Sequence, residues 1–520
     1  MLELYSMNYR LRYFYSRGAF LVLVWVALLN ATYGSLIKMY APLSRSIRGY
    51  TYIPILAVGL CIFSAPFSGW LADARYGNFK VFKAGSVLSF IATVMACASS
   101  LILEHASGNN WSSVIPLIVS GGVNPVVYAL FVVGSLACFV TALQLGLDQM
   151  PESSAANVSS FIAWFIFSQF VGFFVSNTLF SAHTFCAVNG SDHGWSVQFL
   201  SVFPVACMAL VCCSLFLLAP KWLIIEPNCP QSLKTIYQVL KFAAKHKAPL
   251  NRSALTYWEE DVPSRMDLGK SRYGGPFTTE EVEDVKTFFK IIIFLLPVFF
   301  VVLGWQPVHQ VPIDGLSVCT AQLVYNFFFH PLVWVLIATV LKEFVLFPLF
   351  RDKLPSIQKC IGIASFIVLL VQVGSLILNV VAVFHQVSNV YNWLNVIWCV
   401  SCGFMLQFLL TKVFEFSCAQ SPYHMRGLLC GYTALLCFAA LGIGQAMFDM
   451  LHYSARFRDK AYSPVIQSSF AFVVGLIGFI LYCIVAAWYK NRVRDEAYSY
   501  YCQSVVEDVF SRRVAHNTIN

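Results

Sequence analysis

The chain has 520 residues, of which 58% are hydrophobic and only 11% are charged. Charged residues make up about a quarter of an ordinary globular domain, so this composition excludes a soluble protein and indicates one that is embedded in a membrane. Lys and Arg outnumber Asp and Glu by 34 to 25, a net charge of +9, but no basic stripe interleaves with aromatic residues, which excludes a nucleic-acid surface.

Twelve apolar stretches follow one another along the chain, and crossing a bilayer takes about 20 such residues. Basic residues concentrate in both tails, in one charged segment and in alternate loops, so both termini are expected in the cytoplasm. No signal-peptide cleavage site follows the first stretch, which is therefore expected to remain. The expected spans lie near 18–40, 51–72, 81–103, 124–147, 160–181, 196–219, 287–305, 326–350, 357–384, 392–416, 427–450 and 466–489.

This layout predicts an all-α, multi-pass membrane protein with two six-helix bundles. The expected parts are the N-terminal bundle at 1–219, a cytoplasmic linker at 220–286, the C-terminal bundle at 287–490 and a cytoplasmic tail at 491–520. Whether the membrane is the plasma membrane or an endolysosomal one stays open. Sequons at Asn110 and Asn189 fall in expected outside loops, which predicts a glycoprotein.

The loop after the second span holds the first candidate site residues. Residues 69–80 read Gly-Trp-Leu-Ala-Asp-Ala-Arg-Tyr-Gly-Asn-Phe-Lys. An Asp at a helix end can pair with a basic residue or with the N-terminus of a neighbouring helix, and so hold the cytoplasmic side closed. Asp73 and Arg75 are therefore gate candidates, and a charged loop that only follows the positive-inside rule is the alternative.

The linker is expected to be ordered. A helix from Ser232 to about Lys247 would place Leu233, Ile236, Tyr237 and Leu240 on one face, against the cytoplasmic membrane surface. Further along, the spacing of residues 278–281 predicts a capping box that opens the seventh span.

Ionisable residues inside spans are costly and therefore point to function. Lys342 and Glu343 adjoin in the eighth span, and because adjacent helical residues do not face each other, we expect them to have different partners. Lys412 and Glu415 lie three residues apart in the tenth span and can pair. All four lie near cytoplasmic helix ends, which favours an ion-pair or gate role over solute contact.

Polar side chains in the first, fourth, seventh, eighth and tenth spans are candidates for lining a central cavity. His330 is the candidate that titrates near neutral pH, although a buried core histidine is the alternative. Amides that join helices are the alternative for the uncharged residues. Most of the 17 cysteines lie within spans, where packing is favoured over redox or metal chemistry. The cavity candidates are Asn30, Tyr33, Gln144, Gln306, His330 and Gln407.

Four segments carry a resemblance to a known family. Residues 69–80 resemble the signature loop of the major facilitator superfamily. Residues 144–149 (Gln-Leu-Gly-Leu-Asp-Gln), 268–287 in the linker, and 415–426 (Glu-Phe-Ser-Cys-Ala-Gln-Ser-Pro-Tyr-His-Met-Arg) resemble elements of its proton-dependent oligopeptide transporter (POT) family. Asp148 and Arg426, which lie in these elements, are further gate candidates.

The resemblance implies the major facilitator superfamily fold, with twelve transmembrane helices and a cavity between the halves at mid-membrane. It also implies alternating access around that cavity. Family members typically couple the uptake of di- and tripeptides, or of other small solutes, to proton entry. The resemblance therefore implies symport, and membrane lipids are expected to surround the protein.

The family's charged residues are replaced at three places. Trp25, Leu28 and Leu29 stand where the first span of the family carries charges, Phe139 stands at the lysine of the fourth span, and Leu406 at the glutamate of the tenth. Burying an unpaired ammonium or carboxylate costs several kcal/mol, so we expect a more neutral cavity and no standard peptide–proton symport.

Two functions follow from the sequence. The first is a secondary transporter for a small organic solute, with proton coupling in doubt. The alternative is a non-transporting receptor or scaffold that binds a cytoplasmic partner through 221–286 or 490–520. No expected span presents paired acids or clustered His residues, so no enzyme activity, metal or cofactor is expected.

Overall fold

The structure, a computed structural model, describes residues 16–46, 52–108, 119–150, 155–186, 193–225, 232–246, 263–304, 331–346, 349, 355–385, 388–458 and 463–490. Each expected span contains one main helix within these ranges. Those of the N-terminal half are α2 (Arg17–Ser46), α3 (Tyr52–Leu71), α4 (Asn78–Gly108), α6 (Asn124–Leu147), α7 (Ala155–Cys186) and α8 (His193–Leu217). Those of the C-terminal half are α11 (Thr279–Leu303), α13 (Pro331–Leu341), α15 (Ile357–His385), α16 (Ser388–Gln420), α17 (Arg426–Arg458) and α18 (Ser463–Trp488).

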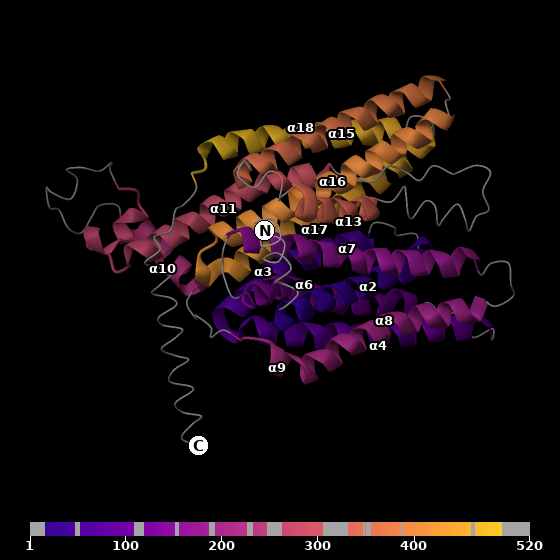
Figure 1. Cartoon of the computed structure of the whole chain (residues 1–520), viewed down its shortest axis with the longest axis horizontal. Helices are drawn as coiled ribbons and strands as arrows, with labels where there is room; N and C mark the ends of the chain where they lie inside the picture. Colours follow the sequence, from indigo (N-terminus) through magenta and orange to yellow (C-terminus); the bar gives the residue numbers. More distant parts are fainter. Residues whose placement is uncertain are drawn as a thin grey trace, which may run out of the picture.

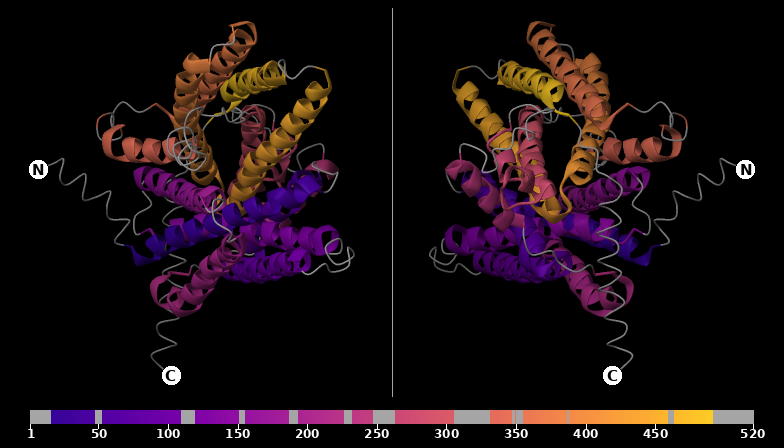
Figure 2. Two further views of the ribbon diagram at one scale, coloured as in Figure 1. Left: turned by 90° about the vertical axis from the view of Figure 1, so that its right-hand side faces the viewer. Right: turned by 90° about the vertical axis from the view of Figure 1, so that its left-hand side faces the viewer.

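The helices form two groups that lie side by side (Figure 1). Within the N-terminal group α4 packs on α6 and α2 on α7, and within the C-terminal group α11 packs on α18 and α15 on α16. The two end-on views in Figure 2 show the indigo-to-magenta helices on one side and the orange and yellow helices on the other. Nine of the described helices are long and apolar enough to cross a membrane.

Apolar side chains cover the outer surface as well as filling the interior. Phe63 is 77% exposed, Leu217 is 70% exposed and Ile484 is 61% exposed. Such residues leave water when hydrocarbon surrounds the bundle, because lipid tails are as apolar as the side chains. The surface therefore agrees with the multi-pass membrane protein that the composition predicts.

The charged segment between the halves lies at one end of the bundles, which we call the linker end (Figure 1). It contains α9 (Ala219–Trp222), α10 (Ser232–Lys245) and two 3₁₀ turns, η5 (Asp267–Gly269) and η6 (Ser271–Tyr273). The predicted helix is present, and its predicted apolar face is half correct, because Ile236 and Leu240 pack into the core while Leu233 and Tyr237 are exposed. Ile236 and Val239 are buried in the same core as the start of α11, whereas Tyr237 is exposed. Packing against α11 selects a stripe centred on Val239 rather than on Tyr237.

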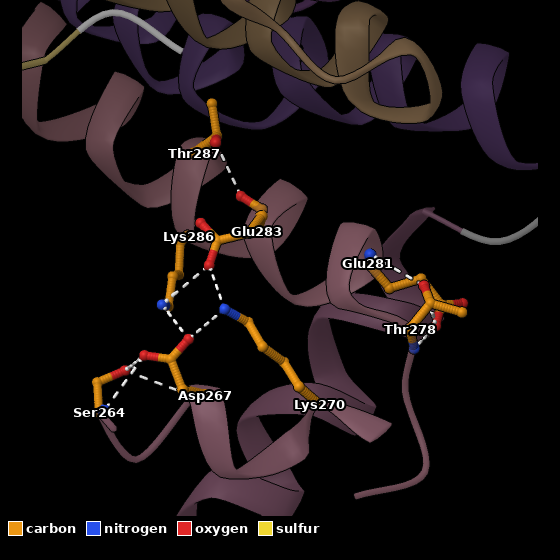
Figure 3. Close-up of polar contacts among 8 residues, drawn as sticks. All are labelled: Ser264, Asp267, Lys270, Thr278, Glu281, Glu283, Lys286 and Thr287. Atoms are coloured by element: carbon orange, nitrogen blue, oxygen red, sulfur yellow. Dashed lines mark hydrogen bonds and ion pairs between the residues drawn. The ribbon is translucent and has the colours of Figure 1, made fainter. Parts of the chain in front are cut away.

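Two hydrogen-bonded groups fix the linker to α11 (Figure 3). The predicted capping box is present, because Thr278 Oγ1 accepts from the N–H of Glu281 at 3.2 Å and Glu281 Oε2 accepts from the N–H of Thr278 at 2.9 Å. Beside it, Lys270 Nζ lies 2.6 Å from Glu283 Oε1 and also binds Asp267. Lys286 contacts the same two carboxylates, so two lysines join the 3₁₀ turn η5 to α11.

This network is expected to weaken in acid. Burial raises the pKa of Asp267, but hydrogen bonds from Lys270, Lys286 and Ser264 outweigh it and hold that pKa well below its usual range. A depressed pKa stabilises the folded linker above the unfolded value of about 3.9, and the stabilisation is lost as pH falls through the folded value. Amide hydrogen exchange of 264–270, corrected for its intrinsic rate, should therefore accelerate below about pH 4.

Asp267→Asn should show the faster exchange already at pH 6, because the amide cannot pair with both ammonium groups. Glu280→Gln is the matched control, since the exposed Glu280 lies outside the network. Equal protection of the wild type and Asp267→Asn at pH 6 would show that the ion pairs do not hold this turn.

Candidate functional site

The two halves meet at the linker end through a small set of helices. There α3 and α6 contact α17, and α7 contacts both α13 and α16. We call these contacts the linker-end interface. Most of the charged residues singled out in the sequence lie here, and they form two groups that differ in chemistry.

The first group centres on Asp73. It lies in η1 (Ala72–Tyr76), a π-helical turn that continues α3. Its carboxylate accepts hydrogen bonds from the N–H of Gly427 at 3.1 Å and of Leu428 at 2.9 Å, both in the first turn of α17. The first N–H groups of a helix have no partner within it, and the helix dipole favours an anion there. An acid of one half thus binds a helix N-terminus of the other.

The environment of Asp73 holds opposing influences. Burial raises the pKa of its carboxyl to about 7, and Asp148 acts in the same direction. The two N–H donors and the charge of Arg426 act in the opposite direction. Asp148 and Arg426 therefore both lie within electrostatic range of Asp73.

Glycines let the two halves approach closely beside Asp73. A Cβ atom added to Gly69 on α3 would lie 2.1 Å from the carbonyl oxygen of Gly427 on α17. A Cβ atom added to Gly431 would lie 2.4 Å from the carbonyl oxygen of Ala65. Backbone packs directly on backbone at both places, so α3 and α17 can contact each other only with glycine there.

The second group is a buried ionic cluster, formed by Lys342, Glu343, Lys412 and Glu415. Lys342 and Glu343 open η8 (Lys342–Leu346), a π-helical turn that continues α13. Glu343 Oε2 accepts a hydrogen bond from Ser160 Oγ of α7 at 2.7 Å, and Lys342 Nζ lies 3.5 Å from Glu343 Oε1. The expectation that these neighbours have entirely separate partners is wrong, because the π-helical turn is not the regular α-helix on which it relied.

Lys412 and Glu415 form the pair that their spacing predicts. Lys412 Nζ donates to Glu415 Oε2 at 2.7 Å, and the same oxygen accepts from Ser159 Oγ of α7 at 2.8 Å. Lys342 is within electrostatic range of both residues. Two lysines and two glutamates of the C-terminal half therefore surround the adjacent serines Ser159 and Ser160 of the N-terminal half.

The two groups occupy corresponding places in the two halves. The turns η1 and η8 each continue the second span of a half, and each carries an acid at its second residue. Asp73 of the N-terminal half binds α17, the fifth span of the C-terminal half. Glu343 of the C-terminal half binds α7, the fifth span of the N-terminal half. Internal repeats of this kind are common in secondary transporters.

A layer of aromatic rings also joins the halves. The ring centroid of Phe139 on α6 lies 5.7 Å from that of Phe414 on α16 and 5.2 Å from that of Phe438 on α17. Phe165 on α7 completes the layer, 5.6 Å from Phe139. These are ordinary distances for favourable ring contacts. Phe139, where the resemblance implies a lysine, is thus the centre of an apolar contact.

Two of the cavity candidates cross between the halves. Gln144 Nε2 lies 2.9 Å from Cys430 Sγ of α17, and Gln407 Nε2 donates to the carbonyl oxygen of Ala163 on α7 at 3.5 Å. Both glutamines are buried. Gln306 and His330 lie outside the described residues.

The other candidates lie within one half or at the surface. Asn30 Nδ2 donates to the carbonyl oxygen of Val26 in its own helix, and the ring of Tyr33 packs between those of Phe131 and Phe173. Asp148 accepts from Asn78 of the same half, and Arg75 is exposed with its guanidinium over the ring of Tyr76. The structure therefore does not bring Arg75 into the linker-end interface.

The replaced family positions in the first span belong to the apolar core of the N-terminal half. Trp25 is fully buried, its Nε1 donates to Ser214 Oγ at 2.7 Å, and its ring stacks on Phe82. Leu29 is buried in the same core, and Leu406 of the tenth span is also buried. Trp25, Leu29 and Leu406 therefore contribute to packing.

Sequence reasoning missed three parts of the interface. Ser159 and Ser160 carry no signal, because serine is common near helix starts. The Phe139 layer resembles any apolar core in a sequence that is 16% aromatic. The close contact of Gly69 with Gly427 joins residues far apart in the chain, so only the arrangement of the helices reveals it.

The arrangement of helices is that of a known class of membrane transporters. No model of a known protein family matches the sequence. The structure of an auto-inhibited POT family peptide transporter is similar, with a TM-score of 0.60 and 14% identity over 92% of this chain and 99% of that one. The POT family transporter PepTSo gives 0.59 and 13% over 92% and 99%. The proton:xylose symporter XylE gives 0.55 and 13% over 89% and 95%.

The chain therefore has the major facilitator superfamily fold, and its described part supplies one main helix for each of the twelve expected spans, six in each half, as the sequence predicts. Within this fold it is similar to POT family structures along about 90% of its length.

Proposed function

We propose that the chain is a secondary transporter, a divergent POT family member that carries a small organic solute by alternating access. The linker-end interface is the observation that carries this proposal. Replacing a buried ion pair by well-packed apolar residues is often neutral or stabilising, so a static scaffold gains little from Lys342, Glu343, Lys412 and Glu415. Charged groups do suit an interface that opens and closes, because they pair in the closed state and are hydrated in the open state.

In this proposal the structure is the state in which the linker end is closed. As the inner gate, Asp73 binds α17, and Glu343 and Glu415 bind α7, and these contacts hold the halves together. Opening separates α3 from α17 and α7 from α13 and α16. The carboxylates then exchange backbone and serine donors for water, which limits the free-energy difference between the two states.

The proposed solute is not a standard peptide. A zwitterionic peptide needs an anionic and a cationic partner in the passage, and unpaired buried charges cost several kcal/mol. The family positions Trp25, Phe139 and Leu406 supply packing instead. We accordingly propose that standard peptide–proton symport is not retained.

Transport is tested with the purified full chain in proteoliposomes and a panel of peptides, amino acids, organic acids and neutral aromatic compounds. Some solute is expected to exchange across the membrane. Ser160 and Glu343 are in hydrogen-bond contact, but a cysteine is shorter than a glutamate, so the two thiols of the variant Ser160→Cys/Glu343→Cys need a short bridge rather than a direct disulfide. Treatment with a short bis-methanethiosulfonate cross-linker should lock the interface and stop exchange, and a reductant should restore it.

Ser160→Cys alone is the matched control, since it has the same new thiol on α7 without its partner. Exchange that continues in the cross-linked double variant would contradict a moving interface. No exchange of any solute at several pH values, with confirmed incorporation, would contradict the transporter function and leave the receptor or scaffold as the better account.

A further inference from the structure

In the described part of the chain, the ammonium group of Lys342 reaches Glu343 only at ion-pair distance and has no hydrogen bond of ordinary length. Lys342 is 4% exposed, and among the described residues no acceptor hydrogen-bonds its Nζ. Glu343 Oε1 is within ion-pair distance at 3.5 Å, and Glu343 already accepts from Ser160. An ammonium carries three donors. Lys342 therefore has donor capacity that the closed interface does not use.

Two further polar atoms on α16 are in the same condition. Gln407 Oε1 and Thr411 Oγ1 are buried without a hydrogen-bond partner in the described part of the chain. With Glu415 they follow a spacing of four residues, which places all three on one face of the helix. That face meets α7 at Ala163 and Ser159. A polar track thus runs along α16 toward the ionic cluster.

The aromatic layer lies next to this track. In the proposed transport cycle, the route that opens between the two halves, here called the passage, would run along both. Phe414 adjoins Glu415 on α16, and Phe165 follows Ser160 by five residues on α7, about 7.5 Å along the axis at 1.5 Å per residue. Their partners Phe139 and Phe438 complete the aromatic layer. A molecule that touches both the layer and Lys342 needs an apolar body of roughly this length and one polar end.

We propose that the passage carries an amphipathic organic anion, a solute with a flat apolar body and a single carboxylate or similar anionic group. This assignment of the solute class rests on the proposed transporter function. The anionic group accepts hydrogen bonds from Lys342 as α7 withdraws, and hydrogen bonds between two ions are stronger than neutral ones. The apolar body replaces the ring contacts of the Phe139 layer.

The charges of the cluster favour an anion over other solutes. Glu415 is already bound by Lys412 and Ser159, and Glu343 by Ser160, so the acids offer less to a cationic group than Lys342 offers to an anion. Lys412 adds a second positive charge within electrostatic range of Lys342, which offsets the charge that the solute brings.

Three probes of one shape separate the possibilities: 1-naphthoate, 1-naphthamide and 1-naphthylmethylammonium. Binding is measured by calorimetry on the purified full chain in nanodiscs. Naphthoate is expected to bind about tenfold more tightly than naphthamide, a difference of about 1.4 kcal/mol, and the ammonium probe more weakly than either.

Lys342→Met should remove the preference for naphthoate while leaving the naphthamide affinity within about a factor of two, because Met keeps the apolar stem and loses the charge. Lys286→Met, in the linker network outside the passage, is the matched control and should keep the preference. Thr411→Val, which changes the unpartnered hydroxyl to a methyl group of similar size, should weaken naphthoate more than naphthamide and does not alter the cluster's charge.

Equal affinity of wild type for naphthoate and naphthamide would overturn the proposal, as would tightest binding of the ammonium probe or no binding of any probe. A preference for naphthoate that survives in both Lys342→Met and Thr411→Val would also overturn it. These failures concern binding selectivity alone. The proposed transporter function has a separate test: it fails if the chain exchanges no solute, or if cross-linking positions 160 and 343 does not stop the exchange.

Discussion

Glu415→Leu is expected to destabilise the folded chain by about 3–5 kcal/mol, because removing one member of a buried ion pair leaves the other charge uncompensated. The charge left behind is the ammonium of Lys412, whose side chain is 14% exposed and 2.7 Å from Glu415. Ser159 Oγ, which lies 3.5 Å from Lys412 Nζ, is a poor replacement for a carboxylate.

The double variant Lys412→Met/Glu415→Leu should recover most of this loss and lie within about 1.5 kcal/mol of wild type, since volume-conserving apolar replacement of a buried pair is often tolerated. Chemical unfolding in detergent micelles measures both variants. The deciding quantity is the coupling free energy between the two positions, which needs Lys412→Met alone as well. It is the change in the double variant minus the changes in the two single variants, so the effects of each side chain alone cancel.

Lys286→Met is the control from the linker network, where Lys270 pairs with the same two carboxylates, Asp267 and Glu283. Its cost should be smaller than that of Glu415→Leu, because neither carboxylate is left without an ammonium partner. Equal destabilisation in Glu415→Leu and in the double variant would mean that Lys412 and Glu415 are not coupled in the folded state.

The fold was predictable because the bilayer imposes a simple rule on sequence. Each span must be apolar over about 20 residues, so the two sets of six could be counted directly. Local rules were equally useful: the Thr278–Glu281 capping box and the Lys412–Glu415 pair depend only on helical spacing, and both are present. The Asp73 contact followed from the position of an acid at a helix end.

What could not be predicted depends on contacts between distant segments or on departures from regular helix. The π-helical turn that starts at Lys342 brings it within ion-pair distance of Glu343, contrary to the α-helical rule. Tertiary packing rotates the buried face of α10 toward Val239. The Phe139 layer needs rings from four helices of both halves, and no spacing within a single helix signals that arrangement.

Gly69→Ala is expected to shift the chain away from the closed linker end. The new Cβ would lie 2.1 Å from the carbonyl oxygen of Gly427, and backbone cannot move aside as a flexible side chain can. Overpacking of this kind costs about 1–3 kcal/mol. The strain exists only in the closed state, because separating α3 from α17 removes the contact. The same separation lengthens the hydrogen bonds from Gly427 and Leu428 to Asp73.

A shift of about 1.4 kcal/mol changes an equilibrium tenfold, and a buried thiol of the chain can report it. Cys430 is 1% exposed and lies at the interface against Gln144, so it reacts only when α17 separates from the N-terminal half. Its alkylation by a maleimide, followed by mass spectrometry, should be about tenfold faster or more in Gly69→Ala. Gly374→Ala is the matched control, because a Cβ there meets nothing within 4 Å, and it should leave the rate unchanged. Equal rates in Gly69→Ala and wild type would show that the close contact of α3 with α17 does not hold the linker end closed. A faster rate in Gly69→Ala alone would assign that role to the glycine contact that places Asp73 on the first turn of α17.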